Sequence, residues 1–226
     1  MRRRLLYSFG LLLLLQHFAF SKSDSTWINR QYYGIGAGMG ITLINSTDIV
    51  DYLNTSFQQS SRIDDFGVAP EFFGFGTFPI SEMWSAKIEY AFIFKSYSTP
   101  VSGLPDFTFS YNVHMPTMLI EYSLINEGFF FKFGGGLGYH VAQFSKNLNI
   151  SDTLYQSSGI GLKLEAEGNT AFDEHLFGTI GLDVRANFMS EFKDTDGNNL
   201  FISAIKKNAR MNFFAIGLKF GVAYYF

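Results

Sequence analysis

The sequence predicts an all-β chain that folds as an eight-stranded antiparallel transmembrane β-barrel, with short turns at one end and long loops at the other. Three observations support this prediction. Segments in which apolar residues alternate with small or polar ones recur along the chain, with the two-residue period of a β-strand. Aromatic residues make up 18% of the chain and charged residues only 16%, against about 25% charged residues in soluble domains. There is no Cys, which excludes disulfide and thiolate scaffolds.

The N-terminus has the features of a cleaved signal peptide. Arg2, Arg3 and Arg4 precede an apolar stretch from Leu5 to Leu15, and a small-x-small cleavage site ends at Ser21. This stretch of about 11 residues is shorter than the ~20 that a spanning helix needs. We therefore assign residues 1–21 to a signal peptide and residues 22–226 to the barrel domain. Removing the three arginines leaves 14 basic and 20 acidic residues, a charge of −6, which does not attract nucleic acid.

The last strand shows the alternation most clearly. From Phe214 to Phe226, every second residue is large and apolar, and the residues between them are small or charged, apart from Tyr225. A soluble barrel places its large apolar residues inside, whereas a barrel in lipid turns them outward. Five further segments alternate in the same way, at 33–43, 86–95, 129–142, 160–167 and 178–188.

Two predicted strands are less regular. In 66–78, Glu71 lies opposite an apolar face, but Phe73 and Phe75 share its parity. In 107–124, the apolar positions change parity near Pro116. Because proline cannot donate to a β-ladder, we expect a β-bulge at Pro116.

The connections give an independent count of the strands. Long polar connections lie near 45–65, 96–106, 145–158 and 189–208, and short ones near 79–84, 125–128 and 169–175. Seven connections join eight strands, and long ones alternate with short ones. This is the plan of a bacterial outer-membrane barrel, with short periplasmic turns, long external loops and both termini in the periplasm. Within the first long connection, 48–57 is either a short helix, with Asp48 as its cap, or an irregular loop.

The chain resembles the small outer-membrane barrels of the OmpA/OmpX type, in the porin-like superfamily. The residues that carry this resemblance are those of the C-terminal strand, which ends Val222-Ala223-Tyr224-Tyr225-Phe226. In that family such an ending is similar to the signal read by the outer-membrane assembly machinery, so the resemblance assigns Tyr224 and Phe226 to this signal. Members of the family differ in function, so the fold alone does not predict an activity.

The parity of the strands predicts a charged lumen. Charged residues facing lipid would cost about 2–4 kcal/mol each for Arg or Lys at the midplane, so we expect them to face inward. Six acids and six bases then share the interior and pair as a plug. They are Glu71, Lys87, Glu89, Lys95, Glu121, Lys132, Lys163, Glu165, Glu167, Asp183, Arg185 and Lys219.

Inward glycines leave a second possibility open. Gly34, Gly36, Gly38 and Gly40 leave one wall bare, and so do Gly134, Gly136 and Gly138. These glycines either make room for long side chains from the opposite wall or leave a narrow water path. The first alternative predicts a plugged barrel and the second a small conduit.

No catalytic, cofactor or metal site is predicted. His114, His140 and His175 lack the spacing of a zinc site, and nothing couples His140 to a nucleophile such as Ser110 or Ser145. The run Asp194–Asn198 lacks the full calcium loop and predicts a turn.

Outer-membrane lipid, lipopolysaccharide and the assembly machinery are the expected partners of a monomer. Lys206 and Arg210 extend the outward parity of the last strand, and we predict that they contact lipopolysaccharide phosphates.

The preferred function is non-enzymatic: an outer-membrane protein that supports envelope integrity or surface interaction through its external loops. The alternatives are a narrow porin-like channel for small or apolar solutes and, third, a lipid-modifying outer-membrane enzyme. A soluble periplasmic β-barrel is the alternative at the level of the fold.

Overall fold

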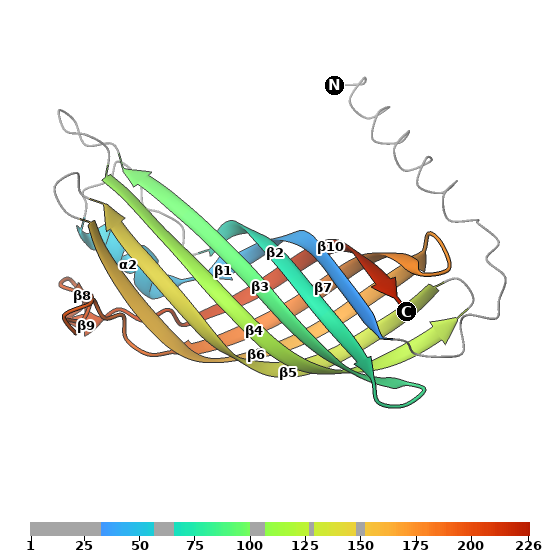
Figure 1. The fold of residues 1–226 in the computed structure, drawn as a ribbon. Helices are drawn as coiled ribbons and strands as arrows, with labels where there is room; N and C mark the ends of the chain where they lie inside the picture. The colour runs from blue at the N-terminus through green and yellow to red at the C-terminus, as the bar shows by residue number, and fades with distance from the viewer. Residues whose placement is uncertain (1–32, 57–65, 100–106, 127–128, 148–151) are drawn as a thin grey trace, which may run out of the picture.

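The computed structural model is a closed barrel of eight antiparallel strands (Figure 1). It describes residues 33–56, 66–99, 107–126, 129–147 and 152–226. The signal peptide predicted at 1–21 lies outside these residues. Around the barrel the strands follow the order β1-β10-β7-β6-β5-β4-β3-β2. Their bounds are β1 Gly34–Asn45, β2 Phe66–Pro79, β3 Trp84–Thr99, β4 Phe107–Asn126, β5 Phe129–Asn147, β6 Asp152–Ala171, β7 Leu176–Met189 and β10 Phe213–Tyr225. The predicted fold class and strand count are therefore confirmed.

The connections at one end are shorter than predicted, because four strands are longer. β3 and β4 stay paired up to Thr99 and Phe107, and β5 and β6 up to Asn147 and Asp152. The predicted long connection at 145–158 is thus mostly strand, and β3 extends into the one predicted at 96–106 as far as Thr99. The first and last connections at this end carry folded structure: helix α2, Thr47–Ser56, and a hairpin of β8, Phe201–Ile202, with β9, Lys207–Asn208. By the rule for such barrels this is the external end.

Both faces of the strands follow the predicted alternation at the level of the membrane. On β10, Phe214, Leu218 and Tyr224 are exposed, while Ala215, Lys219 and Tyr225 are buried. Phe73 and Phe75 of β2, which blurred the pattern in the sequence, are buried in the lumen beside Glu71. An apolar outer surface around a closed ladder leaves no unpaired backbone edge in lipid.

The two faces exchange polarity toward the external end. On β4, the outward residues Met118 and Ile120 are apolar, but nearer the external end the outward residues are Ser110 and Asn112. Inward residues change in the opposite sense, from Glu121 at the membrane level to apolar residues beyond it. Those apolar inward residues of β4 are Phe109, Tyr111, Val113 and Met115, all buried.

The bulge expected at Pro116 is absent. β4 stays in one register with β3 from Trp84–Tyr122 to Thr99–Phe107, and with β5 the same offset holds on both sides of Pro116. The parity change in the sequence therefore reflects a change of surroundings. Outward side chains meet lipid on one side of Pro116 and water on the other, while the backbone continues unchanged.

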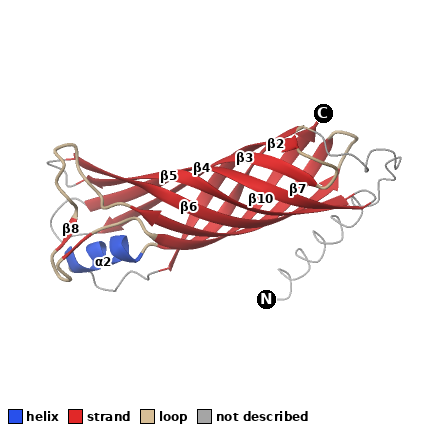
Figure 2. Ribbon diagram, turned by 90° about the horizontal axis from the view of Figure 1, so that it is seen from below, coloured by secondary structure: helices blue, strands red, loops and turns tan. Residues whose placement is uncertain are grey.

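An apolar core fills the external end of the barrel, and we call it the external core. It joins inward strand residues to side chains of α2 and of the segment 190–212, which lie over the end of the barrel (Figure 2). Its largest members are fully buried, and Phe109 and Phe144 stack with their ring centroids 6.3 Å apart. α2 contributes Ile49, Tyr52 and Leu53, and the segment 190–212 contributes Phe192, Leu200, Ile202, Ala209 and Met211.

Aromatic side chains gather at the opposite, periplasmic end, as expected for a girdle at a membrane interface. The rings of Trp84 and Tyr122 lie 5.1 Å apart, and those of Tyr224 and Phe226 lie 5.2 Å apart. Tyr90 lies six residues farther along β3 than Trp84, away from this girdle, and its hydroxyl lies 2.5 Å from Nδ1 of His114.

Three of the four inward glycines of β1 are covered by aromatic rings, and the fourth, Gly40, lies against Leu218 and Lys219. A Cβ added at Gly34 would overlap the ring of Tyr225, one at Gly36 the ring of Phe75, and one at Gly38 the ring of Phe73. The bare wall thus makes room for side chains, as the first of the two alternatives predicted. The side chains come from the neighbouring strands β2 and β10 rather than from the opposite wall.

We expect Gly36→Ala to destabilise the barrel, because its methyl group would meet the Phe75 ring and, at 2.8 Å, the carbonyl oxygen of Val222. Overpacking of this kind typically lowers the free energy of unfolding by about 1–3 kcal/mol. Urea unfolding in lipid vesicles measures the effect. The matched control is Gly74→Ala, whose Cβ would meet only a backbone oxygen at 3.7 Å. Equal stability of the two variants would contradict the filled wall.

Candidate functional site

Eleven of the twelve charged residues predicted for the lumen form one buried network. They come from seven of the eight barrel strands, all except β1. The carboxylates are Glu71, Glu89, Glu121, Glu165, Glu167 and Asp183, and the cations are Lys87, Lys132, Lys163, Arg185 and Lys219.

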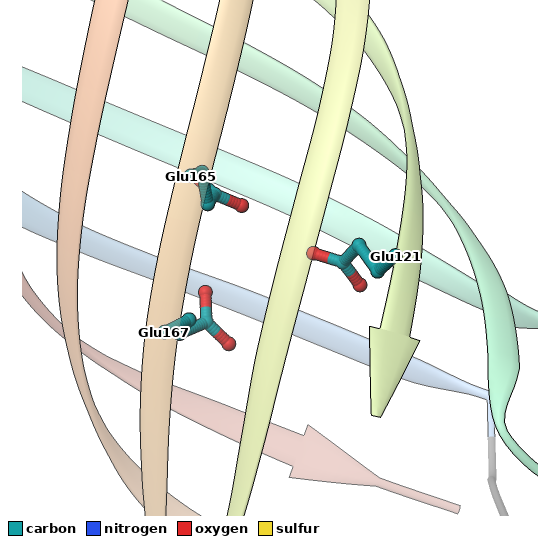
Figure 3. Close-up of side chains that lie close together, drawn as sticks. All are labelled: Glu121, Glu165 and Glu167. Carbon is teal, nitrogen blue, oxygen red and sulfur yellow. The ribbon is translucent and has the colours of Figure 1, made fainter. Parts of the chain in front are cut away.

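Lys87 is the centre of the periplasmic half of this network. Its Nζ lies 2.5 Å from Glu165, 2.9 Å from Glu167 and 3.3 Å from Glu121. Figure 3 shows these three carboxylates converging from β4 and β6. One oxygen of each lies within 4.8 Å of the others, a spacing that would suit a metal ion. The ammonium group of Lys87 supplies the positive charge that this cluster needs.

The other half of the network surrounds Glu89 and Arg185. Glu89 accepts hydrogen bonds from Lys163 at 2.5 Å and from Lys219 at 2.7 Å. Arg185 Nη2 donates to Glu71 at 2.6 Å and to Asp183 at 2.7 Å. Thr42 completes the coordination of Glu71 by donating to its second oxygen at 2.6 Å.

Five of these ion pairs cross the lumen. Lys87 and Glu89 of β3 pair with β6, and Glu71 of β2 pairs with Arg185 of β7. In each case at least two strands lie between the partners in the barrel. Direct neighbours on β6 and β7 carry like charges instead, with Lys163 opposite Arg185 and Glu165 opposite Asp183. Like charges placed in this way are destabilising. Their counterions come both from the same strand, as in Arg185–Asp183 and Lys163–Glu165, and from the other side of the lumen.

Lys95 is the predicted member that the structure does not bring into the network. Its Nζ lies 5.0 Å from the ring centroid of Tyr97, and within the described part of the chain it forms no ion pair. Lys95 follows Ile93, a fully buried residue of the external core, so it lies beyond the charged zone. Parity identified the correct face of β3, but it gave no information about height along the lumen.

Sequence reasoning missed the aromatic part of the network. Lys87 Nζ lies 4.4 Å from the ring centroid of Phe75, and Lys219 Nζ lies 4.6 Å from that of Phe73. Both distances are within the range of cation–π contacts. At the periplasmic end Lys132 donates to the hydroxyl of Tyr225 at 3.2 Å. The available signal was the inward parity of Phe73, Phe75 and Tyr225, which in the sequence looks like an irregularity.

The candidate residues for nucleophilic chemistry lie on different faces. His140 points inward, with Nδ1 hydrogen-bonded to Asn187 and Nε2 3.2 Å from the hydroxyl of Thr117. Ser110 and Ser145 are directly opposite each other on β4 and β5, but both have outward parity. The arrangement therefore does not place His140 beside either hydroxyl.

The external cap consists of α2 and the segment 190–212, which ion pairs hold together. Asp48 accepts from Lys207 Nζ at 2.9 Å and from the backbone N–H of Arg210 at 3.0 Å. The guanidinium of Arg210 donates to Glu191 at 3.1 Å. Hydrogen bonds from Arg210 and Asn208 hold the pKa of the Glu191 carboxyl below its usual range.

Lys206 and Arg210 were predicted to contact lipopolysaccharide phosphates, and the structure places both on the exposed surface of the cap. Lys206 lies in the hairpin turn with a φ of 52°. The charge of Arg210 is balanced locally by Glu191, so Lys206 is the more available of the two. Asp194–Asn198 forms the expected turn, in which Asp194 accepts from the backbone N–H groups of Asp196 and Asn198.

Comparisons with known proteins support the fold. No protein-family model matches the chain, and no curated protein does. Among solved structures, the chain is similar to a major outer membrane protein from Thermus thermophilus, with 12% identity, a TM-score of 0.55 and coverage of 87% of this chain and 100% of the other. Neisserial surface protein A has 13% identity, a TM-score of 0.53 and coverage of 86% and 97%. OprG from Pseudomonas aeruginosa has 14% identity, a TM-score of 0.50 and coverage of 88% and 98%.

These likenesses show a shared fold, and the physics of the surface agrees with it. A closed antiparallel ladder with a continuous outward apolar band has the form of a transmembrane barrel. Among the described residues, no helix is long and apolar enough to cross a membrane. Fold and surface are those of a small outer-membrane β-barrel.

We expect Lys87→Met to lower the free energy of unfolding by about 3–5 kcal/mol, because it leaves the buried Glu167 without a cation and removes one of the cations that neutralise Glu121 and Glu165. Urea unfolding, followed by the heat-dependent shift of the folded band on gels, measures the change. Lys95→Met on the same strand is the control, and there a change below about 1 kcal/mol is expected, because no buried charge loses its partner. Comparable losses in both variants would show that the ion pairs of Lys87 do not stabilise the barrel.

Acid is expected to loosen the external cap. The pKa of Glu191 is lower in the folded than in the unfolded chain. The stability that the Glu191 carboxylate gives to the cap is therefore complete at neutral pH and is lost as the pH falls through that lowered pKa. Limited proteolysis of the segment 190–212, at neutral pH and below the ordinary glutamate pKa of about 4.3, measures this. The Glu191→Gln variant should be cleaved faster than wild type at neutral pH, and acid should raise its cleavage rate less. An unchanged rate would mean that the external core alone holds the cap.

Proposed function

We propose that this outer-membrane barrel is non-enzymatic and non-conducting, and that it acts through its external cap and loops in envelope integrity or surface interaction. The observation that carries the proposal is that buried side chains occupy the lumen at two successive levels, with two different kinds of packing.

The lower closure is the charged network. Its ion pairs run from wall to wall, and the side chains of Lys87, Arg185 and Lys219 are at most 2% exposed. An eight-stranded lumen is just wide enough for side chains to fill. Ions could pass only if these contacts opened, which would leave buried charges without partners.

The upper closure is the external core. Phe109, Phe144 and Phe192 are fully buried there, and the ring centroids of Phe144 and Phe192 lie 6.0 Å apart. Apolar packing of this kind excludes water. It also gives the external end a folded shape, because α2 and the segment 190–212 are anchored by their own apolar side chains and by Asp48.

The non-enzymatic part of the proposal rests on the placement of the candidate groups. His140 is enclosed in the lumen, and Ser110 and Ser145 face outward. His140 and the hydroxyl groups of Ser110 and Ser145 thus lack the shared face that a nucleophile and its base require. The hydroxyl that does lie beside His140, that of Thr117, is buried in the lumen with it.

Folded wild-type protein is expected to give no single-channel steps in planar bilayers, because both closures are intact. Formation of the barrel is first established by the heat-dependent gel shift, and insertion by protection of the strands from protease. Glu89→Gln removes one charge of the lower closure and leaves the external core in place, so it should remain silent as well.

Reproducible conductance steps whose size or ion selectivity changes in Glu89→Gln would contradict the proposal. They would establish a water-filled lumen and favour a narrow channel. Silence in both proteins directs the search for function to the external surface.

A further inference from the structure

The outward face of β3 to β6 beyond the lipid band carries uncharged polar side chains. Asn112, Gln143 and Gln156 lie side by side on β4, β5 and β6, where the register pairs Asn112 with Gln143 and Gln143 with Gln156. We call these three the amide row. In the same way Ser96, Ser110 and Ser145 are direct neighbours across β3, β4 and β5, and we call them the hydroxyl row.

The lack of charge on this face is informative. Soluble surfaces carry about one charged residue in four, and depletion of charge is a feature of the buried parts of interfaces. Apart from Asp152, the first residue of β6, none of the described outward positions of β3 to β6 beyond the lipid band is Asp, Glu, Lys or Arg. Acids and bases are available elsewhere at this height, since Glu191, Lys193 and Arg210 lie on the neighbouring segment.

Two of the three amide groups are available for a ligand. The structure gives no side-chain hydrogen bond for Asn112, Gln143 or Gln156 within the described residues, and Gln156 is exposed while Gln143 is half-buried. The Oδ1 atom of Asn112 is itself buried and has no partner there, so Gln143 and Gln156 are the members open to a ligand. An amide offers two donors and an acceptor with two lone pairs, and a hydroxyl offers one donor and two lone pairs. Strands lie ~4.8 Å apart, so both rows present donors and acceptors at a repeat comparable to the spacing of hydroxyl groups across a sugar ring.

The position of the rows selects among possible ligands. They begin where the apolar band ends, since Phe94 and Asn112 are paired neighbours and His114 is paired with Val141. A group that contacts them lies directly above the acyl chains of the outer leaflet. Anionic phosphates would favour Lys and Arg, whereas uncharged polyhydroxylated groups favour amides and hydroxyls. The amide row ends at Gln156, whose backbone forms an isolated β-bridge with that of Lys193.

We propose that the amide and hydroxyl rows bind the saccharide part of the glycolipid in the surrounding outer leaflet. The contact is made by neutral hydrogen bonds to sugar hydroxyl groups, beside the phosphate contacts predicted for Lys206. This inference deepens the proposed function and rests on it, because a barrel whose wall holds outer-leaflet sugars links neighbouring glycolipids and supports the envelope.

The test compares two glycolipids in binding to the full mature protein, counted by native mass spectrometry from detergent micelles. One is lipopolysaccharide with a complete core oligosaccharide, and the other is lipid A without core sugars. In the variant Asn112→Ala/Gln143→Ala/Gln156→Ala, binding of the first should weaken at least about tenfold, because the neutral hydrogen bonds of the amide row are lost. Binding of lipid A should be unchanged.

Two control variants keep the test specific. Thr170→Ala removes an exposed polar group at the periplasmic end of β6 and should alter neither affinity. Asn112→Gln/Gln143→Asn/Gln156→Asn keeps the amide chemistry and should retain most of the sugar-dependent binding. The gel shift confirms folding, and if the triple alanine variant fails to fold, the single variants Gln143→Ala and Gln156→Ala are each expected to lose about twofold to threefold.

Equal affinities of wild type and alanine variant for the complete lipopolysaccharide would overturn the proposal. So would an equal loss for both lipids, which would place the effect on the phosphate or acyl region. A change of the alanine variant from dimer to monomer in micelles, with glycolipid binding intact, would also overturn it and assign the face to a second copy of the chain. The conductance measurement is independent of all these outcomes, so failure here leaves the non-conducting function standing.

Discussion

The hydrocarbon of a bilayer accepts no unsatisfied polar group, and the rest of this structure depends on that constraint. It closes the β-sheet into a barrel, because an open edge would leave backbone groups unpaired in lipid. It also sends every charged side chain of the membrane-level strands inward, where there is no bulk water. The charges must then neutralise one another, and the geometry of Lys87 among three glutamates is a direct result. Pairs that run across the lumen satisfy the charges and at the same time join opposite walls.

Beyond the bilayer the constraint is lifted, and the two faces of the strands exchange character. Outward residues such as Ser110 and Gln143 meet water, so the inward positions are free to be apolar. The external core is therefore the ordinary hydrophobic core of a water-exposed fold, on the same strands that carry an inverted pattern below. α2 and the segment 190–212 add their apolar side chains to it and give the molecule a folded external end.

The fold was predictable because apolar residues alternate with a period of two, and because the apolar face points outward on every strand at the level of the bilayer. The faces of β10, the inward direction of the charges and the eight strands all followed from alternation and from the order of the connections. Three features did not. The apparent parity change at Pro116 is a change of solvent, and alternation cannot distinguish that from a bulge. Lys95 has the correct face but the wrong height, because parity gives no position along the barrel axis. Partners such as Glu71 and Arg185 are separated by 114 positions, and only the curvature of the closed sheet brings them together.

There is a further physical reason why the lumen at the membrane level contains buried charges and not an apolar core. A buried ion network is rarely more stabilising than well-packed hydrophobic residues of similar volume, and the external end of this barrel uses apolar packing. At the membrane level, however, the outward positions are already apolar. Apolar inward positions would turn each crossing into an uninterrupted hydrophobic segment, prone to aggregation before the barrel closes. At the membrane level the inward face of each strand is charged or small, and beyond the membrane the outward face is polar. Each strand therefore keeps one largely polar or small face along its whole length. The mean hydropathy of the whole chain is accordingly only +0.08, although its folded surface is built for lipid.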